Sequence, residues 1–334
     1  MDLERIPGRT CGPPFPVYPQ LVDTLARAHR GSAVERDATV AHVLATCAGY
    51  SYADVGTVAT MMSRVGFGAH ACVRVSQTVD AMFVFSTAYL LQSGCGRVVV
   101  LSYRGTEPAA LGAWLGDADV GSDSSLLSVA QGFHAPRVHA GFYLNVRATW
   151  WSIIEELNRA LAGRSLLDPD HTVESPLESL YVTGHSLGGA MAVLFALAVA
   201  GDGTHAAIAD RLRAVYTFGQ PMAVCAPVPS WVEEVGRNVI RHVRVRDPVP
   251  ALPPAQWGPF VHVGQEFRHL DGEWRRSKTP VEALSGTRAV AQSMLALLAP
   301  QRQRRSYRYS AAEHRPQHYI EELRPRDRVT ELGD

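Results

Sequence analysis

A serine enclosed by glycines, with a strand pattern before it and a helix pattern after it, constrains this chain more than any other feature. The run is Gly184-His185-Ser186-Leu187-Gly188-Gly189. Residues 180–183 read as a short apolar strand, and residues 190–200 are apolar on all sides, as in a buried helix. A Gly-x-Ser-x-Gly turn in this context is typical of a nucleophile elbow, whose strained backbone makes the serine hydroxyl project from the sheet. The run therefore predicts that Ser186 is a nucleophile, the alternative being a plain glycine-rich turn.

Strand and helix patterns on both sides of this turn predict an α/β fold. The periodicity indicates strands at 82–91, 97–103, 214–218 and 239–245, and helices at 38–50, 53–65 and 142–163. The first two strands flank Ser93-Gly94-Cys95-Gly96, which predicts a β-hairpin. Beyond residue 142 strands and helices alternate, so we expect a mostly parallel central sheet with helices on both faces.

One large domain is expected to account for most of the 334 residues, of which 46% are hydrophobic and 19% charged. We expect a proline-rich leader at 1–37, the α/β domain at 38–325 and a C-terminal tail at 326–334. Within the domain, residues 107–137 contain a Ser/Gly/Asp-rich stretch that fits no regular element and is expected to be mobile. Residues 277–308 match no motif. They predict either a helix packed on the domain or an amphipathic helix with a basic edge at a membrane surface.

The charge balance and the cysteines exclude several classes of partner. Because the formal net charge is +0, bulk electrostatics favours no polyanion, and we expect no nucleic-acid binding. The five cysteines are widely spaced and odd in number, which indicates neither a disulfide framework nor a zinc site. We expect no metal and no cofactor. Composition does not predict the oligomeric state.

The N-terminal residues and the apolar stretches predict a cytoplasmic chain. Residues 1–5 carry two acidic side chains and lead into proline and glycine, unlike a signal peptide. The longest apolar stretch, 190–200, is shorter than the roughly 18 residues that a membrane span needs. We therefore expect neither a signal peptide nor a transmembrane segment.

A serine hydroxyl is a weak nucleophile, so it needs a base and an acid that orients the base. Asp247 is the best placed acid, because it follows the strand at 239–245 and precedes Pro248, where the chain changes direction. A turn aspartate before proline is the alternative. The histidines after Asp247 are His262, His269, His314 and His318. Their spacing alone does not select a base.

Two backbone groups are candidates for stabilising an oxyanion. The N–H of Leu187 directly follows the nucleophile, and a second donor is expected from a loop after an earlier strand. Thr106 is placed for this role at the end of the strand at 97–103, where its N–H and its hydroxyl can both donate. The alternative for Thr106 is to cap a helix that starts at Glu107-Pro108, and the two roles are compatible.

Several motifs occur in the same order in a known family. They are Tyr103-Arg104-Gly105-Thr106, Trp114-Leu115-x-Asp117, Val138-His139-Ala140-Gly141-Phe142, Gly184 to Ala190, Phe218-Gly219-Gln220-Pro221 and Arg246-Asp247-Pro248-Val249-Pro250-x-Leu252-Pro253. Together they resemble the class 3 lipases, the family of the fungal triacylglycerol lipases, with plant phospholipases and bacterial esterases among its relatives. The resemblance covers about residues 40–323 and implies an α/β-hydrolase fold with residues 107–137 as its lid.

The resemblance also distinguishes among the histidines. Residues 313–320, Glu313-His314-Arg315-Pro316-Gln317-His318-Tyr319-Ile320, are similar to the family's Asp-His-x-x-x-x-Tyr ending. This implies that His314 is the general base, with His318 as the nearby alternative and Glu313 in place of the usual aspartate. The same resemblance implies that His262 is not the base and that His139 supports the site structurally.

The function implied is hydrolysis of carboxylic esters of acyl lipids by a serine hydrolase. Ser186, His314 and Asp247 form the triad, and Leu187 with Thr106 stabilises the oxyanion. An acyl ester or lipid is the expected substrate, with transient contact to a membrane or lipid-droplet surface. Two alternatives keep the fold. One is an acyltransferase with the same triad, and the other is a catalytically silent lipase-like binding protein.

Overall fold

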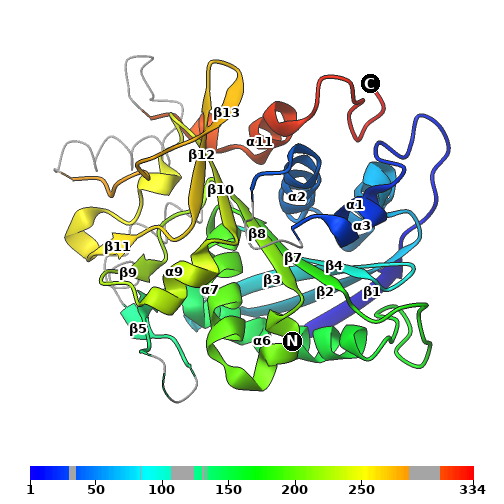
Figure 1. Cartoon of the computed structure of the whole chain (residues 1–334), viewed down its shortest axis with the longest axis horizontal. Coiled ribbons are helices and arrows are strands. Elements are labelled where there is room, and N and C mark those ends of the chain that lie inside the picture. Colours follow the sequence, from blue (N-terminus) through cyan, green and yellow to red (C-terminus); the bar gives the residue numbers. More distant parts are fainter. Residues whose placement is uncertain (30–34, 83, 107–123, 130–131, 133, 286–308) are drawn as a thin grey trace.

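The structure is a computed structural model that describes residues 1–29, 35–82, 84–106, 124–129, 132, 134–285 and 309–334. Its centre is a nine-stranded mixed sheet (Figure 1). Across the sheet the strands lie in the order β1 (Asp2–Pro7), β2 (His70–Val79), β3 (Val84–Ser93), β4 (Val98–Tyr103), β7 (Ser179–His185), β8 (Leu212–Phe218), β10 (Val239–Arg244), β12 (Gln265–Leu270) and β13 (Glu273–Arg276).

The middle of this sheet is parallel and its edges are antiparallel. β4, β7, β8, β10 and β12 run in one direction. β1, β2, β3 and β13 join the edges as antiparallel strands. A second sheet holds β11 (Phe260–Val261), β9 (Val224–Cys225), β6 (Arg137–His139) and β5 (Ser124–Leu126). The carboxyl ends of the five parallel strands thus meet at one edge, where ligands bind in folds of this type.

Helices cover both faces of the large sheet, as Figure 1 shows. One face carries α1 (Leu21–Arg27), α2 (Ala38–Tyr50), α3 (Val55–Met62), η1 (Ser63–Phe67) and α11 (Pro316–Leu323). The other carries α6 (Ala140–Leu161), α7 (Leu187–Gly201), α8 (Ala206–Ala209) and α9 (Ser230–Gly236). Short helical turns are η2 (Asp80–Met82), η3 (Gly203–His205), η4 (Val249–Ala251), η5 (Ala255–Trp257) and η7 (Ala311–His314).

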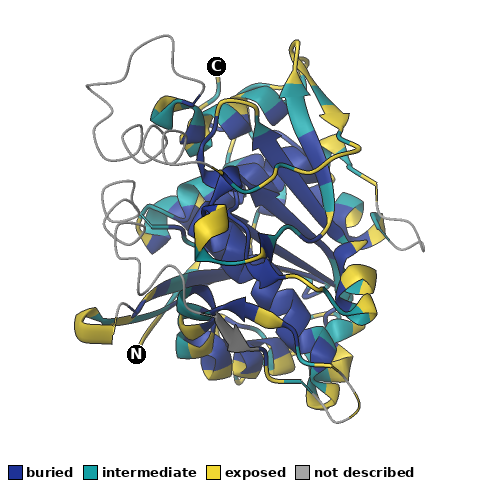
Figure 2. Ribbon diagram, turned by 90° about the vertical axis from the view of Figure 1, so that its left-hand side faces the viewer, coloured by how far each residue is buried: buried dark blue, intermediate teal, exposed yellow. Residues whose placement is uncertain are grey.

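Two apolar cores fill the space between the sheet and these helices. Figure 2 shows the buried residues gathered on the sheet and on the helix faces that touch it. α7 is buried over nearly its whole length, as an all-apolar helix requires. α6 is amphipathic and buries Val146, Ile153 and Leu157 along one side. The predicted α/β architecture with helices on both faces is confirmed.

Several predicted elements coincide with observed ones. The helix predicted at 38–50 is α2, and the predicted hairpin is β3 with β4, paired antiparallel. The helix predicted at 53–65 begins at Val55, where the side chain of Asp54 accepts a hydrogen bond from the Thr57 N–H as an N-cap. It ends as α3 at Met62 and continues as the π-helical turn η1.

The expected leader at 1–37 is not separate from the domain. β1 pairs with β2 in the large sheet, and Arg5 forms an ion pair with the buried Glu156 of α6. In α1, Leu21 and Leu25 have no exposed surface. The expected tail at 326–334 also packs on the domain, because Tyr50 donates a hydrogen bond to Glu331 at 2.8 Å. Described residues of both segments thus pack against the rest of the chain.

Two other expectations fall largely outside the described residues. Most of the expected lid at 107–137, including the possible helix start at Glu107-Pro108, and residues 286–308 of the segment 277–308 are not described. Residues 277–285 form no helix. In the described part of the chain, no single helix is long and apolar enough to cross a membrane. The bent pair Leu187–Gly201 and Gly203–Ala209 meets that test only jointly, with a bend of 94°.

The integration of the N-terminal segment can be tested with Leu25→Ala. Because Leu25 is fully buried in α1, the substitution should lower the free energy of unfolding by about 2–5 kcal/mol. Leu3→Ala is the matched control, since Leu3 in β1 is 40% exposed and should change stability much less. Urea denaturation measures both. Equal small effects would mean that residues 1–37 do not belong to the core.

Buried histidines predict how stability depends on pH. Burial lowers the pKa of His42 to about 4 and the pKa values of His185, His242 and His262 well below 6.5. Between pH 6.5 and about 4 the unfolded chain therefore binds protons that the folded chain does not. The free energy of unfolding should fall as pH falls through this window.

Urea midpoints at pH 7.5 and pH 5 measure this dependence. His242→Phe should make the pH dependence of stability shallower, because it removes one of the buried titrating groups. The phenylalanine ring should be accommodated, since His242 packs against Phe218 and Trp274. His171→Phe should leave it unchanged, since the His171 side chain is 78% exposed. A midpoint that does not fall at pH 5 would contradict the prediction.

Candidate active site

Ser186 lies on the sharp turn between β7 and α7. Its φ is +58° and its ψ is −132°, a conformation that residues other than glycine rarely adopt. The turn is fixed on the neighbouring strand, because the Ser186 N–H donates to the carbonyl of Phe218 at 2.9 Å. The Ser186 side chain is buried. The strained turn that the sequence predicts is thus present, and it places the hydroxyl at the carboxyl edge of the sheet.

His314 is the histidine that faces this serine. It ends η7, just before α11, and its Nε2 lies 2.9 Å from Ser186 Oγ. Its Nδ1 lies 2.8 Å from Asp247 Oδ2. A neutral His314 whose Nδ1–H donates to Asp247 therefore has Nε2 free to accept the serine proton. The three residues that the sequence analysis singled out are brought together in the order serine, histidine, aspartate.

Asp247 is a buried carboxylate with several donors. It follows β10, and its Oδ2 also accepts a hydrogen bond from the Tyr319 hydroxyl at 2.6 Å. Its Oδ1 accepts one from the Val249 N–H at 2.9 Å, the contact of an Asx turn before the prolines. Burial and the negative charge of Asp247 raise the pKa of Tyr319 well above 10, so Tyr319 stays protonated and keeps donating.

Gly219, at the end of β8, lies so close to His314 and Asp247 that a side chain there would clash with both. Its φ is +59°, and a Cβ there would lie 2.6 Å from Asp247 Oδ2 and 3.0 Å from His314 Nδ1. Since β8 lies between β7 and β10, the strand end that carries Gly219 is framed by those that carry Ser186 and Asp247. The Phe218-Gly219-Gln220-Pro221 motif therefore marks a position where a side chain cannot fit beside the triad.

The two predicted oxyanion donors lie beside the elbow. Leu187 is the first residue of α7, where an N–H has no acceptor within its own helix. Thr106 follows Gly105 at the end of β4, the strand next to β7. A Cβ on Gly105 would lie 2.5 Å from the carbonyl oxygen of His185, which shows how closely this strand end approaches the elbow. Both candidates therefore sit at the same edge as Ser186.

The other candidate histidines are directed elsewhere. The His318 side chain is 37% exposed and lies 3.8 Å from Glu321 on the surface of α11. His262 Nε2 lies 2.7 Å from the Pro250 carbonyl, and His269 pairs with Glu322 at 3.0 Å. His139 is fully buried at the start of α6, with its ring stacked on Phe142 at 4.0 Å. Of these histidines, His314 is thus the one whose ring nitrogen lies within hydrogen-bonding distance of Ser186 Oγ.

Glu313, the departure from the usual aspartate, forms an ion pair with Arg244. Arg244 Nε lies 3.0 Å from Glu313 Oε2, and the same guanidinium pairs with Glu322 of α11. Arg244 ends β10, three residues before Asp247. The glutamate therefore helps to hold the segment that carries His314 against the strand that leads to the acid.

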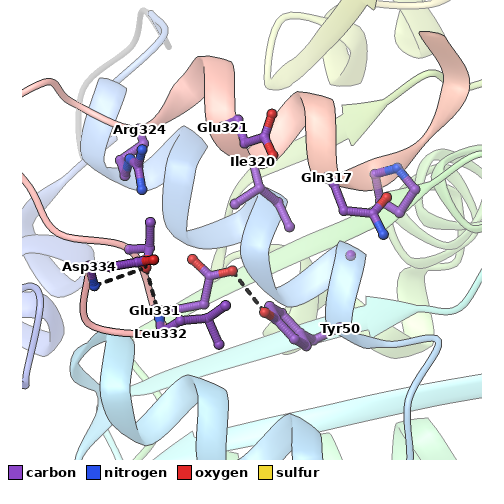
Figure 3. A pocket seen from close by; sticks show the side chains of 11 residues that line it. Tyr50, Gln317, Ile320, Glu321, Arg324, Glu331, Leu332 and Asp334 are labelled. Atoms are coloured by element: carbon purple, nitrogen blue, oxygen red, sulfur yellow. Dashed lines mark hydrogen bonds between the residues drawn. The ribbon is translucent and has the colours of Figure 1, made fainter. Parts of the chain in front are cut away.

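A pocket of about 370 Å³ lies close to this segment but is not lined by the triad. Figure 3 shows it between α2, α11 and the C-terminal residues, with Tyr50 bonded to Glu331 across it. Its walls also hold Ile320 and Arg324. Neither Ser186 nor His314 lines it.

Residues 100–257 match the model of the family described as lipase (class 3). This part of the chain, a little under half of its length, is therefore similar to the class 3 lipases. The lipase of Rhizomucor miehei is 38% identical over 98 residues, which are 29% of this chain and 26% of that protein. The secreted mono- and diacylglycerol lipase A of Penicillium cyclopium is 27% identical over 56% of this chain and 53% of its own length. The chain spans about half or less of the length of these two relatives.

Solved structures agree with the fold. The structure of lipase II from Rhizopus niveus has a TM-score of 0.56 at 20% identity and covers 83% of this chain and 92% of its own. The α/β-hydrolase fold expected from the motifs is thereby confirmed. Because the sequence identity is low, this likeness concerns the arrangement of the elements and not the chemistry.

Two residues at this site were not singled out from the sequence. Tyr319 belongs to the Asp-His-x-x-x-x-Tyr ending, and its position in that motif was a signal that it serves the site. Tyr52 has no such signal, because it follows α2 and meets the elbow only through the fold, by a hydrogen bond to His185.

Gly219→Ala tests the close packing around the histidine and the aspartate. The new methyl group would displace Asp247 or His314, so labelling of Ser186 by a fluorophosphonate, which reports an activated serine, should slow by about 10²-fold. Gly272→Ala is the matched control. Gly272 has a φ of +80°, and a Cβ there meets nothing within 4 Å. Equal labelling rates in the two variants would contradict this account of Gly219.

Proposed function

We propose that this chain hydrolyses carboxylic ester bonds of acyl lipids, with Ser186 as the nucleophile. The observation that carries the proposal is the hydrogen-bonded series Ser186, His314 and Asp247, with distances of 2.9 Å and 2.8 Å, on a strained strand-to-helix turn. Such a series activates a serine hydroxyl because the base is already aligned with its proton. The match to the class 3 lipase family supports an ester as the substrate.

Acylation follows from these positions. Ser186 Oγ attacks the ester carbonyl while His314 Nε2 takes the hydroxyl proton, and Asp247 stabilises the imidazolium that forms. The Leu187 N–H and Thr106 donate hydrogen bonds to the negatively charged oxygen of the former carbonyl. The tetrahedral intermediate then breaks its bond to the alcohol oxygen. His314 gives the proton to that oxygen, so the alcohol leaves and the acyl group stays on Ser186.

Deacylation repeats the steps with water. His314 Nε2 removes a proton from a water molecule, whose oxygen attacks the acyl carbonyl. The second tetrahedral intermediate breaks its bond to Ser186 Oγ, which takes the proton back from His314 Nε2, and the carboxylic acid is released. No metal or redox cofactor enters this proposal, because each proton that moves has a donor and an acceptor among the triad, the water and the leaving group.

Glycerides are the substrate class we favour. One relative is named a mono- and diacylglycerol lipase and another a lipase, although this chain spans only part of each. We propose contact with a membrane or lipid-droplet surface, since such substrates gather there. Mono-, di- and triacylglycerols, a phosphatidylcholine and p-nitrophenyl esters of graded chain length, assayed together, would define the head group and the acyl length.

Substitutions in the triad test the proposed reaction. Ser186→Ala and His314→Ala should each lower kcat on p-nitrophenyl butyrate by at least about 10³-fold, because each removes a group that makes or breaks a bond. His318→Ala should stay within a few-fold of the wild type, since His318 lies on the surface of α11. Ser179→Ala, at the opposite end of β7, is the control for removing a buried serine hydroxyl.

The products decide between hydrolysis and transfer. Fatty acid release into water that ceases in Ser186→Ala would support the proposal. A new ester formed with an added alcohol, in preference to free acid, would instead assign acyl transfer. If the folded wild type neither reacts with a fluorophosphonate at Ser186 nor hydrolyses any of these esters, the proposal is wrong and a binding role takes its place.

A further inference from the structure

His185, the residue before the nucleophile, is buried against the base and forms two hydrogen bonds. Its ring centroid lies 4.5 Å from that of His314. Its Nε2 lies 2.7 Å from the backbone carbonyl oxygen of His314, and its Nδ1 lies 2.9 Å from the hydroxyl of Tyr52. The triad mechanism uses neither residue. They form a continuous series from the turn after α2, through the elbow, to the main chain of the base.

The direction of these hydrogen bonds follows from the atoms involved. A carbonyl oxygen only accepts, so His185 Nε2 carries the proton that it donates to His314. Nδ1 of the neutral ring is then an acceptor, and the Tyr52 hydroxyl must donate to it. Burial and the neighbouring His314 lower the pKa of His185 well below 6.5, which keeps the ring neutral. One tautomer of His185 therefore satisfies both bonds.

The chain does not continue as a helix after His314, so the His314 carbonyl oxygen lacks the N–H donor that a helix would supply. A helix that continued through His314 would supply an N–H from its next turn. The residue after His314 instead precedes Pro316 and is extended, with φ of −66° and ψ of 133°, as residues before proline usually are. α11 then starts at Pro316. The donor that the structure gives to the His314 carbonyl is the His185 side chain.

Tyr52 also contacts the strand end that carries the candidate oxyanion donor. A Cβ on Gly105 would lie only 2.1 Å from the Tyr52 hydroxyl oxygen. The guanidinium of Arg104 lies over the Tyr52 ring, 5.9 Å from its centroid. The hydroxyl of Tyr52 thus lies against Gly105 at the same place where it bonds to the ring of His185. A displacement of Tyr52 would therefore disturb both Gly105 and the ring of His185.

We propose that Tyr52 and His185 are positioning residues that hold the main chain of His314, so that Nε2 stays aligned with Ser186 Oγ. His185 is anchored by the elbow that carries the nucleophile, so its bond to the His314 carbonyl fixes the base relative to the serine. Tyr52 fixes the orientation of the His185 ring. The inference rests on the proposed esterase activity for its kinetic test, although the contacts themselves do not depend on it.

Tyr52→Phe, His185→Leu and His185→Gln test the proposal in the full chain, assayed on p-nitrophenyl butyrate. Burst titration counts competent sites, so kcat is obtained per active site and misfolded protein does not contribute. His185→Leu should lower this kcat about 10²-fold, the effect expected when a reacting group is misplaced by about 1 Å. Tyr52→Phe should lower it about tenfold, because the expected displacement is smaller. KM should change less than twofold, because neither side chain is proposed to touch the substrate.

His185→Gln provides the rescue. Its amide nitrogen can donate near the place of Nε2, so kcat should recover to within about tenfold of the wild type. Tyr50→Phe is the matched control. It also removes a tyrosine hydroxyl with a hydrogen bond, to Glu331 at 2.8 Å, two residues away and outside the site (Figure 3). It should leave kcat unchanged.

Two outcomes would overturn the proposal. In one, His185→Leu keeps a kcat per active site within twofold of the wild type. In the other, His185→Gln lowers kcat as much as His185→Leu does, so the hydrogen bond donated to the His314 carbonyl does not matter for the rate. If the wild type proves inactive, the proposed function fails instead. The downfield proton resonance of the His314 Nδ1–H then tests positioning directly, and it should broaden or shift in Tyr52→Phe and His185→Leu but not in Tyr50→Phe.

Discussion

The buried carboxylate of Asp247 is the charge around which the C-terminal part of the fold is arranged. An ionised group without exposed surface is stable only when donors surround it, and here they come from three separate places. The Val249 N–H belongs to the turn after the acid, whereas His314 and Tyr319 come from η7 and α11. Satisfying one carboxylate therefore docks the segment that carries the base. The same hydrogen bonds therefore stabilise the buried charge and position the histidine.

The base is held by more than its bond to the acid. Arg244 pairs with Glu313 and Glu322 on either side of His314 along the chain, and α11 packs on α2 through Ile320. The His185 ring contacts the main chain of His314 from the elbow. His314 is thus supported both from β10 and from the elbow, although it comes from a segment far along the chain from the serine. Such support lets a hydrogen bond between distant residues keep a fixed geometry.

The features that the sequence predicts well are those set by neighbours along the chain. α2 and the β3–β4 hairpin depend on local periodicity and turn residues, and the elbow depends on glycines within five positions. β1 escapes prediction because its proline-rich surroundings suggest a leader, and its partner β2 lies about 70 residues away. Only the sheet edge that β2 offers makes residues 2–7 a strand.

The site divides in the same way. Ser186 and Asp247 are marked by the turns that they occupy, whereas His314 needed the resemblance to a family, since four histidines were equivalent by spacing. The Tyr52 contact with His185 joins residues 133 positions apart and leaves no local pattern. Contacts of this kind are decided by the three-dimensional packing of segments and become visible only once the fold is known.

The order of the triad along the chain has a consequence for synthesis. The strand-to-helix turn of Ser186 and the carboxylate of Asp247 are both made before residues 309–323, which supply His314 and Tyr319. During translation, a nascent chain can therefore form the elbow and most of the sheet while its serine lacks a base. The hydrogen bond from Ser186 to His314 can therefore form only after residues 309–323 have been made and have docked on the sheet.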